Sequence, residues 1–213
     1  MTLEERINRI IYTSEIELAG GAYKEKYELD NGKSIKKFIL DKLRLNERRK
    51  TKVYTNLDTG EKISISGNSA GKLASHYKHG ETYQKTIAHI PQIIENMKFL
   101  EEMKPDKENA KFDNYSYYVT RINTDGISHT ILSTVGHNEY RVYYDQNVFE
   151  GTPEEVFKEA RTSNDSKYSR LKEILKDNKK EAVDPSELHS GDKPQPASAN
   201  KYTKNSLDVQ GEN

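Results

Sequence analysis

Two histidines have surroundings that suit proton transfer. His137 lies in a predicted turn and is followed by Glu139 and Arg141. His76 lies near the end of a predicted helix, close to His79. Because histidine exchanges a proton near neutral pH, either residue could act as a general acid or base. Each also has a simpler interpretation: His137 as a turn residue that tolerates an unusual backbone, and His76 as a cation favoured by the helix dipole.

Alternate residues of one predicted strand, Arg141, Tyr143 and Asp145, share a face. An arginine there could contact a phosphate, a tyrosine could stack on a base, and a carboxylate could orient another group. The same alternation also describes an ordinary solvent-facing strand. The catalytic candidates are therefore His76, His137 and Arg141, and the candidates for nucleic-acid contact are Arg48, Arg49, Lys50, Arg141 and Tyr143.

The basic cluster formed by Arg48, Arg49 and Lys50 follows a helix predicted to begin at Ser34. Cations at the carboxyl end of a helix are favoured by its dipole even without a ligand, so a solvated helix end is the simpler interpretation. The whole chain has 34 basic and 34 acidic residues. Any attraction to nucleic acid must therefore come from a local patch.

Composition narrows the chemistry further. The chain has no cysteine, which excludes disulfides, thiolate nucleophiles and cysteine-based zinc sites. Since no further ligand can be placed beside His76 and His79, we expect neither a metal nor another cofactor. The first residues, MTLEERINRIIYTSEIELAGG, contain no long apolar run, so we expect no signal peptide, no membrane association and a cytoplasmic location.

The residues from 113 to 149 predict an antiparallel meander that the other elements must support. Three runs of β-branched and aromatic residues are separated by Asn-Thr-Asp-Gly and by Gly136-His137-Asn138. Alternation along these strands predicts one face packed on helices and one polar face. A further strand is predicted around residues 99–103, and a hairpin over residues 52–66.

Helical periodicity predicts helices over residues 3–18, 69–77, 82–97 and 153–160, with a kink or a break at Pro91. The predicted fold is α+β, with helices preceding a curved antiparallel sheet of about four strands. We divide the chain into a helical segment (1–51), an α+β core (52–162), a charged helix (163–180) and a tail (181–213). The tail is predicted to be disordered because it is rich in Pro, Ser, Asn, Asp and Lys and has almost no aliphatic residues.

The segment from residue 62 to about residue 150 carries the sequences KISISGNSAGKLASH, HIPQIIENM, YSYYV, INTDG and RVYYD in that order. With these features it resembles the third type of large polyvalent protein-associated domain, which is found in large proteins of phages and conjugative elements. Such domains are similar to the barnase, EndoU and colicin group of nucleases. The resemblance implies either a metal-independent ribonuclease or a relative that keeps the fold for binding.

Two functions follow as hypotheses. The first is an accessory or interaction module of a phage or mobile element, which binds a protein or RNA without chemistry. The alternative is an endoribonuclease in which His76 or His137 transfers protons and Arg141 contacts the phosphate. Because no catalytic set is complete in the sequence and fold analogy does not establish function, we expect the binding module.

Overall fold

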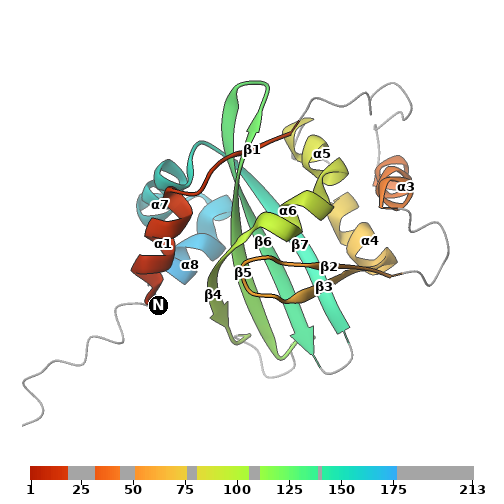
Figure 1. Ribbon diagram of the computed structural model, residues 1–213, viewed down its shortest axis with the longest axis horizontal. Coiled ribbons are helices and arrows are strands. Elements are labelled where there is room, and N and C mark those ends of the chain that lie inside the picture. Colours follow the sequence, from red (N-terminus) through yellow and green to blue (C-terminus); the bar gives the residue numbers. More distant parts are fainter. Residues whose placement is uncertain (19–31, 44–50, 76–80, 106–110, 139–140, 177–213) are drawn as a thin grey trace, which may run out of the picture. The chain divides into compact units, whose positions relative to one another are not determined.

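Four long strands form an antiparallel sheet at the centre of the fold (Figure 1). Asp125 and Gly126 join two of them with positive φ angles of 55° and 80°, as a tight hairpin turn requires. The meander is confirmed, but its second strand continues through Asn138, so His137 lies in a strand and not in the predicted turn. The spatial order is β4 (Lys98–Met103), β5 (Asn114–Thr124), β6 (Ile127–Asn138) and β7 (Arg141–Glu150).

The computed structural model describes residues 1–18, 32–43, 51–75, 81–105, 111–138 and 141–176. The contacts of the chain group Met1–Lys179 into one unit and Lys180–Asn213 into a second. The tail predicted to be disordered lies outside the described residues. Among the helices that are described, none is long and apolar enough to cross a membrane.

A short fifth strand makes the sheet mixed, which differs from the purely antiparallel prediction. β1 (Ile16–Glu17) runs parallel to β5 with Ile16 opposite Ile122, on the same edge of β5 that β4 uses. The helix predicted to continue to residue 18 therefore ends early, as α1 (Leu3–Ile11). The physical reason is that Ile16 and Leu18, two residues apart, pack as one face of an extended segment against Ile122 and its apolar neighbours.

Helices cover both faces of the sheet (Figure 1). On one face lie α3 (Gly32–Lys42), α4 (Gly67–Ser75), α5 (Glu81–Ala88) and α6 (Ile90–Asn96), around a core that includes Tyr118 and Tyr144. On the other lie α1, α7 (Pro153–Thr162), the short helical turn η2 (Ser166–Tyr168) and α8 (Ser169–Lys176), around a core that includes Tyr117 and Val119. Neighbouring tyrosines of β5 thus enter opposite cores.

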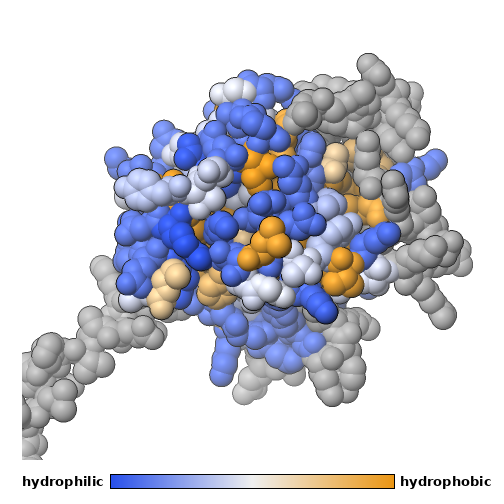
Figure 2. Space-filling view, viewed as in Figure 1, coloured by the Kyte–Doolittle hydropathy of each residue, from blue (hydrophilic) through white to orange (hydrophobic). Residues whose placement is uncertain are grey.

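The prediction that one face of the meander stays polar is therefore wrong. Tyr117 and Val119 are 2% and 1% exposed, because α1 and the helices after the sheet cover them. In α8, Leu171 and Ile174 supply the apolar stripe that packs there. The visible surface in Figure 2 is largely hydrophilic, with hydrophobic side chains in separate small groups.

Two predictions for the first half of the chain are confirmed. β2 (Lys52–Thr55) and β3 (Lys62–Ile65) form an antiparallel hairpin beside the main sheet. Pro91 stands in the first turn of α6, where its missing N–H breaks no helical hydrogen bond, so the helix predicted over residues 82–97 is divided at His89.

The close approach of Phe112 to β6 gives a test of this packing. A Cβ atom at Gly136 would lie 2.9 Å from Phe112 Cγ and 3.1 Å from Tyr115 Cε1, both closer than normal packing. We predict that Gly136→Ala lowers the free energy of unfolding by about 1–3 kcal/mol, measured by urea denaturation. Gly67→Ala is the control, because nothing lies within 4 Å of its Cβ and alanine favours a helix. An equal or smaller loss for Gly136→Ala than for the control would contradict this packing.

Candidate functional site

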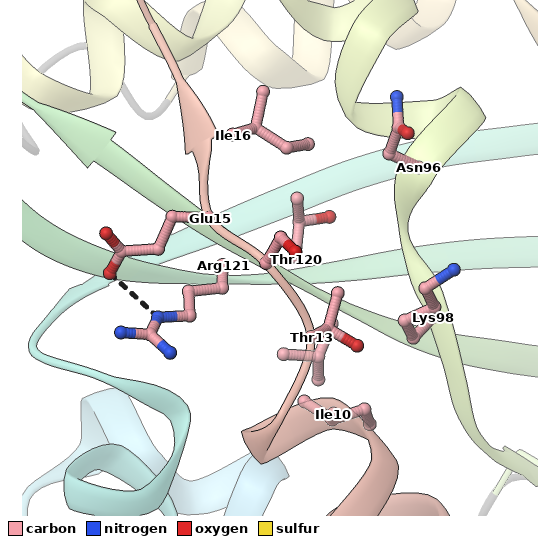
Figure 3. A pocket seen from close by; sticks show the side chains of 10 residues that line it. Ile10, Thr13, Glu15, Ile16, Asn96, Lys98, Thr120 and Arg121 are labelled. Atoms are coloured by element: carbon pink, nitrogen blue, oxygen red, sulfur yellow. Dashed lines mark hydrogen bonds and ion pairs between the residues drawn. The ribbon is translucent and has the colours of Figure 1, made fainter.

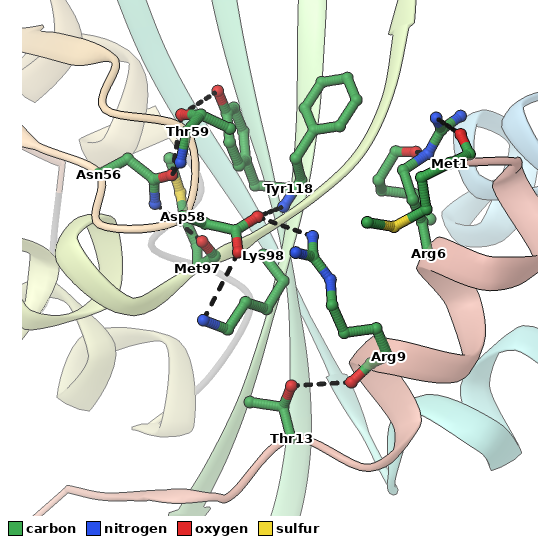
Figure 4. A network of polar contacts seen from close by, with 12 residues as sticks. Met1, Arg6, Arg9, Thr13, Asn56, Asp58, Thr59, Met97, Lys98 and Tyr118 are labelled. Atoms are coloured by element: carbon green, nitrogen blue, oxygen red, sulfur yellow. Dashed lines mark hydrogen bonds and ion pairs between the residues drawn. The ribbon is translucent and has the colours of Figure 1, made fainter.

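The turn between β2 and β3 is fixed by a buried asparagine. Asn56 is 0% exposed, and its Nδ2 donates hydrogen bonds to the carbonyls of Ile94 and Met97 at 2.8 and 2.7 Å (Figure 4). Its Oδ1 accepts from the backbone N–H and the hydroxyl of Thr59 at 3.0 and 2.9 Å. Since a buried amide is costly unless it is hydrogen-bonded, these bonds hold the turn against the end of α6.

A buried carboxylate in the same turn joins two further elements. Asp58 Oδ2 accepts from Arg9 Nη2 of α1 at 2.8 Å and from the backbone N–H of Phe99 in β4 at 3.0 Å. Its side chain is 8% exposed, so the paired guanidinium and the N–H compensate a charge that water barely reaches. Lys98 Nζ lies 3.7 Å from Oδ1, beyond hydrogen-bond distance (Figure 4).

The last residue of the turn, Glu61, faces the main sheet. The hydroxyl of Tyr118, on β5, donates to Glu61 Oε2, and Thr59 Oγ1 lies 3.5 Å from the same hydroxyl. Burial raises the pKa of the Tyr118 phenol well above its usual value, and the Glu61 carboxylate raises it further. Tyr118 therefore stays a neutral donor that orients the carboxylate.

The other oxygen of this carboxylate meets His137. Glu61 Oε1 lies 3.2 Å from His137 Nε2, and the two side chains are 23% and 24% exposed. Both of these atoms are buried, and neither makes a hydrogen bond of good geometry. The contact is thus a close carboxylate–imidazole approach that becomes an ion pair when the imidazole is protonated. Such a pair has the chemical groups of a general base and a general acid.

Of the site residues predicted from the sequence, the structure describes the side chain of His137 but not those of the others. His137 acquires a partner, Glu61, which the sequence analysis missed because nothing local links the hairpin turn to the end of β6. Arg141 and Tyr143 lie in β7, opposite Asn138 and Gly136 in register. Their side chains are not among those that the structure describes. His76 and the cluster Arg48, Arg49 and Lys50 also lie outside the described residues.

A separate pocket of about 200 Å³ opens at the edge of the sheet (Figure 3). One wall carries Glu15, which accepts hydrogen bonds from Ser128 and from Arg121 Nε, the latter at 2.7 Å. The Ser128 hydrogen bond is the largest cause of a lowered pKa of Glu15, and Arg121 lowers it further. Glu15 is thus a paired carboxylate at the pocket wall.

Within the described residues, no group of three or more His, Asp or Glu side chains could hold a metal ion.

A comparison with known families matches the model of large polyvalent protein-associated domain 3 over residues 30–143. The chain belongs to this family. The matched region contains Glu61, Tyr118 and His137, whereas Arg9 lies outside it. Comparisons with curated proteins and with solved structures found no match.

The hydrogen bonds of Asn56 give a direct test of how the domain holds its hairpin. We predict that Asn56→Ala costs about 2–4 kcal/mol in unfolding free energy, because it removes its bonds and leaves two buried carbonyls unpaired. The measurement is urea denaturation of both proteins. Asn68→Ala, at an exposed position, should change the value by less than about 0.5 kcal/mol. A loss below about 1 kcal/mol for Asn56→Ala would show that the turn is not fixed in this way.

Proposed function

We propose that the chain is a metal-independent endoribonuclease of a phage or another mobile genetic element, in which Glu61 and His137 transfer the protons. The observation that carries this proposal is the distance of 3.2 Å between Glu61 Oε1 and His137 Nε2, on side chains that are each about a quarter exposed. Membership of the large polyvalent protein-associated domain 3 family supports the setting in a mobile element.

The chemistry requires one base, one acid and no redox step. The carboxylate of Glu61 takes the proton of a ribose 2′-hydroxyl, and the 2′-oxygen attacks the neighbouring phosphorus. Protonated His137 gives its proton to the 5′-oxygen as the P–O5′ bond breaks. The products are a 2′,3′-cyclic phosphate and a 5′-hydroxyl. Tyr118 holds the carboxylate by donating to its other oxygen.

A cation must stabilise the extra negative charge on phosphorus-bound oxygens in the transition state. Arg141 is the residue proposed for this role. It pairs in register with Asn138, the residue after His137, so its backbone lies at the same end of the sheet as the acid–base pair. In this proposal, substrate binding separates Glu61 from His137 and places the phosphate between them.

A second candidate function is binding without chemistry, and one observation favours it. Glu61 Oε1 and His137 Nε2 are buried and face each other, so the pair links the hairpin to β6 without any ligand. Under this alternative, the domain joins a protein or RNA partner and the pair is structural. The two functions differ in whether RNA is cut.

The purified full chain, incubated with 5′-labelled RNA in EDTA, is expected to release fragments that end in a 2′,3′-cyclic phosphate. We predict that Glu61→Gln and His137→Gln each slow cleavage by about 10²–10⁴-fold, the usual contribution of a general acid or base. RNA with a 2′-O-methyl group at every position should stay intact, because it lacks the attacking hydroxyl.

Glu95→Gln and His89→Gln are the matched controls, since Glu95 is exposed on α6 and His89 lies outside the pair. Both should cleave at the rate of the unmodified chain. RNA that stays intact with a folded, pure chain would reject the endoribonuclease and leave the binding module. Equal cleavage by the two site variants would show that these residues are not the acid and base.

A further inference from the structure

The edge of β5 is interrupted where the pocket lies. β4 pairs with this edge as far as Val119, and β1 pairs with it from Ile122 onward. In the described part of the chain, Thr120 and Arg121 therefore have no strand partner on this edge. The pocket is the space that this break leaves, between α1, β1, β5 and the end of α6 (Figure 3).

Thr120 gives this space an unused hydrogen-bonding group. The residue is 3% exposed, and its Oγ1 has no hydrogen-bond partner among the described residues. A buried hydroxyl without a hydrogen-bond partner destabilises the fold. In Figure 3, Thr120 lies between Ile16 on one side and Lys98 on the other. A ligand or a water in the pocket would remove this cost.

The positive charge of Lys98 is only loosely paired with a carboxylate. Its ammonium lies 3.7 Å from Asp58, which already accepts closer bonds from Arg9 and from the Phe99 N–H. The side chain is 28% exposed and also lines the pocket. Lys98 can therefore bind an anion without leaving Asp58 uncompensated.

The charged side chains that line the pocket carry a net positive charge of one. Arg121 is paired with Glu15 through Nε at 2.7 Å, and Lys98 is the second cation of the lining. A singly charged anion with oxygen atoms would accept from Lys98 and from the Thr120 hydroxyl. A carboxylate and a phosphate diester both have this chemistry.

The size of the pocket restricts the ligand further. A water takes about 30 Å³ in the liquid, and pockets for drug-sized ligands span about 300–1,000 Å³. The volume of about 200 Å³ lies between these values. It fits a small ligand or one group of a larger one.

We infer that this pocket binds a singly charged oxyanion group, held by Lys98 and Thr120. The inference does not rest on the proposed nuclease function, because it concerns a different edge of the sheet and its test uses neither RNA nor cleavage.

The test is a titration of the ¹⁵N-labelled full chain with sodium acetate and, separately, with sodium dimethyl phosphate, at constant ionic strength set by NaCl. We expect saturable shifts of the amide signals of residues 14–16 and 119–121 with at least one of the two anions. Saturation by acetate alone identifies a carboxylate site, and saturation by dimethyl phosphate alone identifies a phosphate diester site.

Lys98→Met should weaken the binding at least tenfold, and Thr120→Val, which keeps the side-chain shape, should weaken it severalfold. Lys158→Met, on the exposed face of α7, is the matched control and should leave the binding unchanged. Shifts that do not saturate, that chloride reproduces, or that persist in both site variants would overturn the inference and leave a pocket that holds water only.

Discussion

The docking of the β2–β3 turn is the constraint on which the rest of the site depends. Asn56 binds the end of α6, and Asp58 binds α1 and the first residues of β4, so one turn joins the distant α1 to the consecutive elements α6 and β4. Apolar contacts alone do not fix the register of a turn, because they are not directional. Buried hydrogen bonds do fix it, since each shift would leave a polar group unpaired. This docking determines the position of Glu61.

Neighbouring tyrosines of the main sheet lie on opposite sides of it, one facing this hairpin. Tyr118 enters the core on the side of the hairpin and meets Glu61, while Tyr117 enters the opposite core under α7 and α8. The family match covers residues 30–143, so the second core combines the family domain with α1, which precedes it, and with α7 and α8, which follow it. The edge of β5 is divided between β4 and β1, and the break between them becomes the pocket.

Local signals in the sequence predict the local parts of this structure. The meander, the hairpin and the division of the helix at Pro91 follow from turn residues, alternation and the geometry of proline. The sequence does not predict β1, because Ile16 and Leu18 also fit a helical period. It does not predict the second covered face: helices are predicted over residues 153–160 and 163–180, but no local pattern shows which face of the sheet they cover. The pairing of Glu61 with His137 is a long-range contact, which no local pattern encodes.

The docked hairpin brings Glu61 into contact with His137. A double-mutant cycle measures this contact directly, from the unfolding free energies of the unmodified chain, Glu61→Ala, His137→Ala and the double variant. We predict a coupling free energy of at least about 0.5 kcal/mol, as found for residues in contact. Additivity within about 0.3 kcal/mol, as found for independent sites, would contradict it.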